Sequence, residues 1–237
     1  GKSTLARAVM QMVPVEAGNV VWLGDELVGL DTGQMRVHRK EMQMIFQDPL
    51  ASLNPRMTIG QIVADPLKTH HPNLSGDEMK ARVREVLDTV GILPNLVNRY
   101  PHEFSGGQCQ RIGIARALVV DPKLIICDEP VSALDVSIQA QVINLLMKLQ
   151  EETGVALIFI AHDLSVVKHI SDRVMVLYLG NVMEIAPSDR LYANPMHPYT
   201  EALISAVPIP DPKLEAAKEV LLLDHDLPSP LNPPSGC

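Results

Sequence analysis

LIICDEP, at Leu124–Pro130, is the stretch of sequence that decides the fold. Its near-continuous apolar run is typical of a parallel strand that is buried on both faces. The strand ends in two adjacent acids, Asp128 and Glu129, and burying both is costly unless a cation offsets their charge. We therefore expect Asp128 to hold Mg²⁺ indirectly and Glu129 to polarise an attacking water. An acid that merely caps a strand–loop junction is the alternative.

GKST, at Gly1–Thr4, is the tail of the phosphate-binding loop G-x-x-x-x-G-K-[ST]. In such a loop, Lys2 contacts the β- and γ-phosphates and the Ser3 hydroxyl ligates Mg²⁺. Leu5–Met12 reads as the following helix, whose N-terminus favours an anion. A chance GKST at a helix start is the alternative. Because the chain opens inside the loop, we expect its earlier glycines, the preceding strand and any adenine-stacking aromatic residue upstream.

FSGGQ, at Phe104–Gln108, precedes an apolar-faced helix at Cys109–Val119. Ser105 is a good N-cap, and the two glycines after it allow close backbone approach to an anion. In isolation, an ordinary flexible helix start is the better explanation of the same residues.

Composition excludes several classes of protein. The 237 residues are 46% hydrophobic, which is enough for a substantial core, but runs such as VALIFIA at 155–161 are too short to span a bilayer. The net charge is -8 without a Lys/Arg cluster, which argues against a nucleic-acid partner. The three cysteines lack zinc spacing, Cys127 reads as a buried structural thiol, and the count fits a reducing cytoplasm.

The alternation of strands and helices predicts an α/β fold with a doubly wound, parallel sheet. A helical insert spans about 58–119, where Ser75 and Glu78 form a capping box and Gly91 marks a helix end. Gly180-Asn181 predicts the turn of an antiparallel hairpin. The remaining expected strands are 19–23, 42–46, 123–127 and a buried 155–161; the expected helices are 136–152, 189–193 and 199–206, before a proline-rich tail from Pro208.

In this order, GKST, FSGGQ, LIICDEP and AHD at Ala161–Asp163 resemble the motifs of the ATP-binding subunits of ABC transporters. The resemblance implies a P-loop NTPase core and a helical subdomain that carries the SGGQ motif. It also implies that His162 senses the γ-phosphate, and that Gln47 meets Mg²⁺ and water and couples to the membrane subunit. The segment Ser132–Asp135 matches the D-loop, which crosses a dimer interface. Phe104 replaces the commoner Leu.

The resemblance yields three sets of expected site residues. In this family the SGGQ element contacts the γ-phosphate on the opposing subunit, so one chain supplies two half-sites and a dimer is implied. The catalytic residues are Glu129, His162 and Gln47. The Mg²⁺ residues are Ser3, Gln47 and Asp128. The residues that contact ATP are Gly1, Lys2, Ser3, Thr4, Ser105, Gly106, Gly107, Gln108 and Asp135.

Longer segments are similar to the bacterial oligopeptide and dipeptide importers, above all to the oligopeptide group. Examples are IFQDPLASLNPRMTIG at 45–60 and NPMHPYTEALISAVP at 194–208. The resemblance implies an ATPase domain at 1–187, with its helical subdomain at about 57–119, and a C-terminal importer extension at 188–237. It also implies a second ATPase subunit, two membrane permeases, an external peptide-binding protein, and a peripheral location on the cytoplasmic face of the membrane.

Three alternatives stay open at this point. The first is a related importer of dipeptides, nickel or other small solutes. The second is a soluble ABC ATPase that acts on DNA or ribosomes, which the acidic charge and the importer-like tail disfavour. The third is a subunit that binds nucleotide without hydrolysing it, which the intact Glu129, His162 and SGGQ disfavour.

Overall fold

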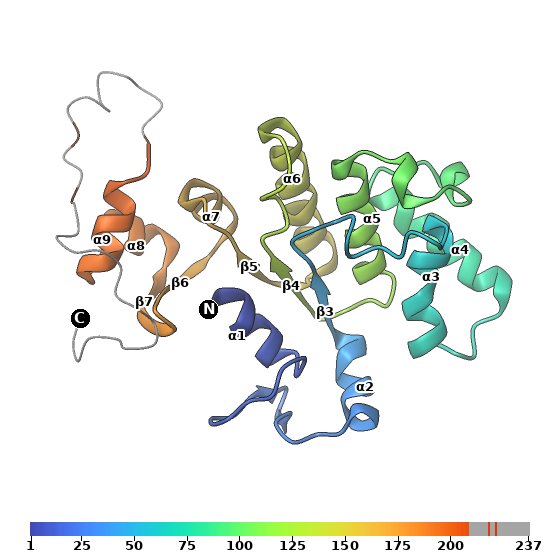
Figure 1. Cartoon of the computed structure of the whole chain (residues 1–237), viewed down its shortest axis with the longest axis horizontal. Coiled ribbons are helices and arrows are strands. Elements are labelled where there is room, and N and C mark those ends of the chain that lie inside the picture. The colour runs from blue at the N-terminus through green and yellow to red at the C-terminus, as the bar shows by residue number, and fades with distance from the viewer. Residues whose placement is uncertain (209–217, 219–220, 222–237) are drawn as a thin grey trace. The chain divides into compact units, whose positions relative to one another are not determined.

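The computed structural model describes residues 1–208, 218 and 221, so most of the predicted proline-rich tail, and Cys237, lie outside the described residues. The chain divides into two compact units (Figure 1). One unit is Ser3–His162. The other contains Gly1–Lys2 and the described residues from Asp163 onward. Each unit is described by itself below.

A three-stranded parallel sheet lies at the centre of the first unit (Figure 1). Its strands are β3 (Met42–Ile45), β4 (Leu124–Asp128) and β5 (Ala156–Ile160), which pair in that order. All five residues of β4 are buried, because this strand has a neighbour on each side and helices over both faces. The parallel sheet and the burial of β4 confirm the predicted α/β core.

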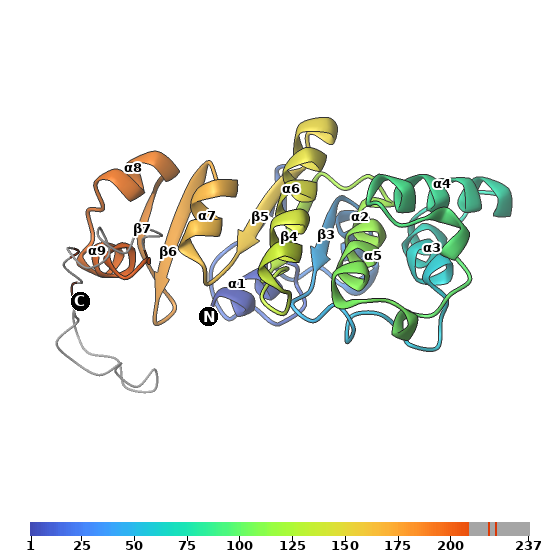
Figure 2. The same ribbon diagram turned by 90° about the horizontal axis from the view of Figure 1, so that it is seen from above.

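Helices cover the two faces of this sheet (Figures 1 and 2). On one face lie α1 (Lys2–Val9) and α2 (Thr32–Glu41), near the short ribbon of β1 (Val21–Trp22) and β2 (Asp25–Glu26). On the other lie α5 (Gly106–Leu118) and α6 (Val136–Thr153). Between the sheet and the helices on the first face lies one apolar cluster. Its buried members are Ala6, Met10, Leu27, Met35, Met42, Met44, Leu124, Ile126 and Ile160. The alternation along β3 and β4 explains how one sheet supports both layers.

The predicted burial of the strand at 155–161 is wrong for most of its length. In β5, Ile158 is 43% exposed, and Leu157 and Phe159 are half-buried. In the described sheet β5 is an outer strand with one neighbouring strand, β4. An apolar run thus identified the strand correctly but not its place in the sheet.

A helical insertion interrupts the chain between β3 and β4, as predicted. It contains α3 (Ile59–His70), α4 (Gly76–Thr89), two 3₁₀ turns at Pro94–Leu96 and Pro101–Glu103, and α5. The predicted capping box is present: Ser75 Oγ accepts from the Glu78 N–H, and the Glu78 carboxylate accepts from the Ser75 N–H. Gly91 follows α4 with a φ of 74°, which glycine adopts without strain.

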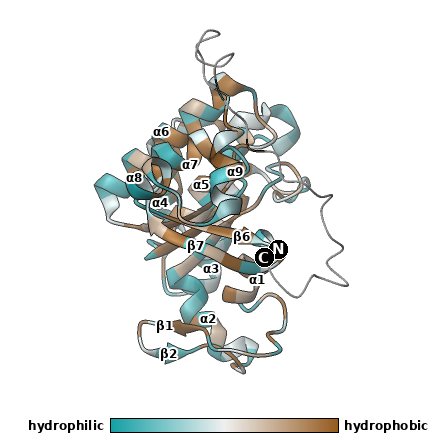
Figure 3. Ribbon diagram, turned by 90° about the vertical axis from the view of Figure 1, so that its left-hand side faces the viewer, coloured by the Kyte–Doolittle hydropathy of each residue, from teal (hydrophilic) through white to brown (hydrophobic). Residues whose placement is uncertain are grey.

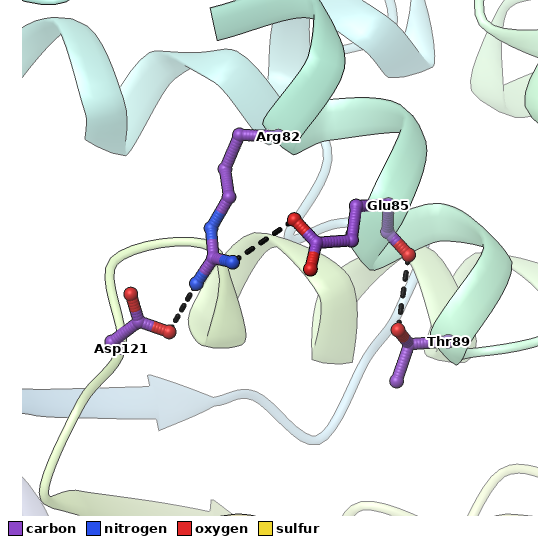
Figure 4. A network of polar contacts seen from close by, with 4 residues as sticks. All are labelled: Arg82, Glu85, Thr89 and Asp121. Atoms are coloured by element: carbon purple, nitrogen blue, oxygen red, sulfur yellow. Dashed lines mark hydrogen bonds and ion pairs between the residues drawn. The ribbon is translucent and has the colours of Figure 1, made fainter. Parts of the chain in front are cut away.

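An ion-pair network ties α4 to the turn that precedes β4 (Figure 4). The Arg82 guanidinium lies 3.1 Å from a carboxylate oxygen of Glu85 and also pairs with Asp121. The Thr89 hydroxyl donates to the Glu85 carbonyl at 3.0 Å. Asp121 lies in the left-handed region, with a φ of 53°. The network links the middle of α4 to the turn between α5 and β4.

The second unit is built on an antiparallel hairpin of β6 (Arg173–Tyr178) and β7 (Asn181–Pro187), both largely apolar (Figure 3). The turn residues are Leu179 and Gly180, with φ values of 47° and 86°, as a type I′ turn requires. The predicted hairpin is therefore confirmed, with its turn one residue earlier because Asn181 already pairs with Tyr178. The helices of this unit are α7 (Leu164–Ile170), α8 (Ser188–Ala193) and α9 (Pro198–Ser205).

Two valines of α6 provide a matched test of the core. Val142→Ala removes two methyl groups from a fully buried site and should lower the free energy of unfolding by about 2 kcal/mol. Val136→Ala makes the same chemical change where the side chain is 81% exposed, and should change it by less than about 0.5 kcal/mol. Urea denaturation of both variants measures the difference; equal losses would contradict the packing of α6 on the sheet.

Candidate functional site

A hydroxyl and a carboxylate meet where α1 begins and β4 ends. Ser3 Oγ donates to Asp128 Oδ1 at 2.7 Å. Asp128 is the last residue of β4 and is 2% exposed, whereas Ser3 is half-buried near the start of α1. The fold therefore joins two of the three predicted Mg²⁺ residues across 125 positions of sequence.

The backbone changes direction sharply after Asp128. Glu129 has a φ of 50°, an unusual value for a residue with a side chain, and such strain costs on the order of 1–3 kcal/mol. Two contacts hold it: the Glu129 N–H donates to the Ile160 carbonyl at 3.0 Å, and the Glu129 carbonyl accepts from Ser132 Oγ at 3.1 Å. Because of this turn, the Glu129 side chain does not continue the alternating pattern of side chains along β4.

The Glu129 carboxylate joins two further predicted residues. Gln47 Nε2 donates to Glu129 Oε2 at 2.8 Å, and His162 Nε2 lies 2.5 Å from Glu129 Oε1. The Glu129 side chain is 7% exposed and that of His162 is 69% exposed. Gln47 follows β3, Glu129 follows β4 and His162 follows β5, so the carboxyl ends of three parallel strands deliver the three side chains to one place.

The SGGQ element starts α5. Ser105 Oγ accepts from the Gln108 N–H at 3.4 Å, and Gln108 Oε1 accepts from the Ser105 N–H at 2.9 Å, which completes a capping box. This reciprocal bond was not part of the sequence prediction, although the S-x-x-Q spacing would have allowed it. Ser105 and Gln108 are exposed, and Gly106 and Gly107 are half-buried.

The two glycines lie against the segment that contains Asp135. A Cβ on Gly106 would lie 3.5 Å from Leu134 Cδ2, and a Cβ on Gly107 would lie 2.4 Å from Ile138 Cγ2. Asp135 itself is exposed and precedes α6, where its carbonyl accepts from the Gln139 N–H. The element at 105–108 and the segment at 134–138 thus form one surface of the first unit.

The structure brings together some, but not all, of the predicted residues. The contacts above join Ser3 to Asp128, and Glu129 to Gln47 and His162. Thr4 is exposed on α1. Gly1 and Lys2 belong to the other unit, so their predicted phosphate contacts stay predictions.

The residues present fit Mg²⁺. The hydroxyl of Ser3 and the buried carboxylate of Asp128 are hard oxygen donors, and Mg²⁺ typically takes one or two such groups and completes its shell with phosphates and water. Within residues 1–208, 218 and 221, no three His, Cys, Asp or Glu side chains gather as a metal site would need.

Burial raises the pKa of the Cys127 thiol to about 12. A thiol with that pKa stays protonated at neutral pH, so it packs as a small apolar group within β4. The prediction of a structural cysteine is confirmed.

The chain matches two known sequence families. The family described as "ABC transporter" matches residues 1–132, more than half of the chain, and the chain therefore belongs to that family of ATPases. A second family, "Oligopeptide/dipeptide transporter, C-terminal region", matches residues 183–237.

Several relatives align with the whole chain, and two of them illustrate the range of identity. The oligopeptide transport ATP-binding protein OppF of Escherichia coli strain K12 is 66% identical over 237 residues, which are all of this chain and 71% of that protein. A putative oligopeptide transport ATP-binding protein of Bacillus subtilis strain 168, YkfD, is 54% identical over the same 237 residues and 72% of its own length.

A solved structure shares the fold. It is the dimeric, post-hydrolysis ATP-binding cassette MJ0796 bound to ADP and Pi, with a TM-score of 0.72, 30% sequence identity, and coverage of 79% of this chain and 81% of that one.

Among the residues that the structure describes, no helix has the length and apolar character needed to cross a membrane.

The crowded glycine of the SGGQ element yields a test. Gly107→Ala should lower the free energy of unfolding by at least about 1 kcal/mol, because the new methyl group overlaps Ile138, as overpacking does. Gly106→Ala meets only an ordinary contact and should be neutral or stabilising, since alanine favours helix by about 1 kcal/mol. Ile138→Ala combined with Gly107→Ala should relieve the overlap. Chemical denaturation of the parent protein, Gly107→Ala, Ile138→Ala and the double variant gives the coupling, with Gly106→Ala as the control, and purely additive effects would contradict the contact.

Proposed function

We propose that this chain binds MgATP at the end of β4 and hydrolyses it to drive peptide import. The observation that carries the proposal is the Glu129 carboxylate, 7% exposed and in contact with Gln47 and His162. A buried acid with two polar partners suits a general base, because its position and orientation are fixed before the substrate arrives. The family match supports the same chemistry.

Each residue of the site has a proposed role. Glu129 polarises the attacking water, His162 reports on the γ-phosphate, and Gln47 orients the water. Ser3 and Gln47, and Asp128 indirectly, would hold Mg²⁺ together with the phosphates. Gly1, Lys2 and Thr4 would bind phosphate. The bound cation would neutralise charge that builds on the phosphate oxygens. Phosphoryl transfer depends mainly on such positioning and charge stabilisation, so these groups suffice.

We further propose that the site is completed by a second ATPase subunit, in a heteromeric pair. Ser105–Gln108 caps α5 and exposes a helix N-terminus to the outside of the first unit, which suits the γ-phosphate held by the opposing subunit. Asp135 is exposed beside it, as a residue at a subunit interface would be before assembly.

The names of relatives support a proposal for the cargo. Proteins 66% and 54% identical to this chain carry names that refer to oligopeptide transport, and the C-terminal family match refers to oligopeptides or dipeptides. We infer an ABC importer subunit that lies on the cytoplasmic face of the membrane, beneath two permease subunits fed by an external peptide-binding protein. A division into an ATPase domain at 1–187 and an importer extension at 188–237 belongs to this proposal.

The alternatives are weaker. A dipeptide or nickel importer would use the same ATPase chemistry, and only transport assays with the assembled complex separate it from an oligopeptide importer. A soluble ABC ATPase acting on nucleic acid is disfavoured by the net charge of -8 and by the C-terminal match.

Replacement of Glu129 tests the hydrolytic role. Glu129→Gln keeps the size and shape of the side chain but removes its negative charge and basicity, so ATP should still bind while turnover falls by at least roughly 100-fold. The measurement is steady-state ATP hydrolysis by the complete transporter in lipid vesicles, with nucleotide binding measured in parallel. Glu151→Gln, an exposed change on α6, is the matched control and should leave turnover unchanged. Near-normal turnover of Glu129→Gln, in a complex whose partner site is inactivated, would exclude the role as base.

Replacement of Ser105 tests the contribution to an opposing subunit. Ser105→Arg places a long cation at the start of α5, where a small N-cap is needed, and should abolish transport-coupled hydrolysis by the complex. Nucleotide binding to this subunit alone should persist, because its own phosphate-binding residues are intact. Fluorescence titration with an ATP analogue on the isolated subunit, beside turnover of the complex, separates the two effects. Loss of binding to the isolated subunit would argue for a site within one chain.

A further inference from the structure

Arg116 is an isolated charge in an apolar stretch, GIARALVV at 113–120. It lies in the last turn of α5, and its neighbours Ala115 and Ala117 are fully or almost fully buried. Desolvation lowers the pKa of the Arg116 guanidinium, and the nearby Asp65 carboxylate on α3 opposes that shift. A cation is held in such a place only where its hydrogen bonds compensate for lost hydration.

The partner of Arg116 is a backbone carbonyl in the loop that follows Gln47. Arg116 Nη1 donates to the Ser52 carbonyl oxygen at 2.5 Å. A charge-assisted bond of this kind is stronger than one between neutral groups. It joins residues 64 positions apart, from the end of the SGGQ helix to the loop at 47–55.

Hydrogen bonds within that loop connect Ser52 to the residue that follows Gln47. Asp48 Oδ1 accepts from the N–H groups of Leu50 and Ala51, both at 2.9 Å, and the Asp48 carbonyl accepts from the Ser52 N–H at 3.1 Å. These bonds close a compact turn that starts one residue after Gln47. The next residue, Leu53, is 2% exposed and anchors the far end of the turn in the core.

We propose that Arg116 is a positioning residue: it fixes the loop at 47–55 to the SGGQ helix, and so sets the Gln47 amide against the Glu129 carboxylate. The loop is then held at both ends, by Gln47 on Glu129 at 2.8 Å and by Arg116 on Ser52 at 2.5 Å. A movement of α5 is carried to Gln47 through a rigid turn. The inference rests on the function proposed above for Gln47 and Glu129.

The same helix offers a matched control. Arg111 lies on α5 and also donates to a backbone carbonyl, that of Val90, at 2.8 Å. Its second contact, at 3.2 Å, is to the Gln141 side chain on α6. Arg111 therefore resembles Arg116 in chemistry and in its helix, but it does not bond to the loop at 47–55.

The test is a kinetic cycle in the complete transporter. Arg116→Met should lower kcat for ATP hydrolysis by at least roughly tenfold with KM for ATP changed by less than about threefold, because it removes the anchor of a residue that acts in the reaction. Arg116→Lys, which retains a cationic donor, should recover part of that loss, and Arg111→Met should change kcat by less than about threefold. In a Gln47→Ala background, Arg116→Met should cause no further loss, since residues that act through one another are not additive.

The outcomes separate the inference from the function beneath it. Suppose that Gln47→Ala lowers kcat and that Arg116→Met lowers kcat of the Gln47→Ala variant by a further, equal factor. Arg116 then does not act through Gln47, so the inference is wrong while the proposed function stands. Equal losses of kcat in Arg111→Met and Arg116→Met would also contradict the inference, because they would show that Arg116 only stabilises α5. If Gln47→Ala retains full turnover, the role proposed for Gln47 fails first, and the inference fails with it. Hydrogen exchange over residues 47–55 adds a direct readout, and should accelerate in Arg116→Met alone.

Discussion

Two buried carboxylates at the end of one strand impose the constraint on which the rest of the site depends. Asp128 and Glu129 are 2% and 6% exposed and adjacent in sequence. Charges so placed are stable only when each has partners of its own. The fold separates them by the turn at Glu129, which gives Asp128 to the Ser3 hydroxyl and Glu129 to Gln47 and His162.

The parallel sheet is what makes that separation possible. In a parallel arrangement the carboxyl ends of neighbouring strands meet at one edge, so the residues after β3, β4 and β5 converge without a long loop. Strain at Glu129 is maintained by a bond from its N–H to the carbonyl of Ile160, the last residue of β5. The energy that the sheet gains by pairing β4 with β5 therefore also holds the Glu129 backbone in its unusual conformation.

Motif and periodicity predicted most of this arrangement. The apolar run at 124–127 identified a buried strand, and the chemistry of two adjacent acids pointed to a cation and a base. The sequence could not reveal the positive φ of Glu129, because no glycine or asparagine marks the position. It also overstated the burial of β5, since an apolar run has the same appearance in a central strand as in an outer one. Arg116 was given no role from the sequence, although it stands out there as a charge in an apolar stretch of helix.

The residues of the site differ in how the fold holds them. Ser3, Asp128 and Glu129 are held by strand ends and a helix start, whereas Gln47 lies on a loop whose far end is fixed to α5. His162 contacts the same carboxylate with a largely exposed side chain. A change in the position of α5 can therefore reach the Glu129 carboxylate by a route through the loop at 47–55, which Asp48 keeps compact. Because that route ends on Gln47 rather than on Glu129 itself, α5 can alter the orientation of the amide while the buried acid stays in place.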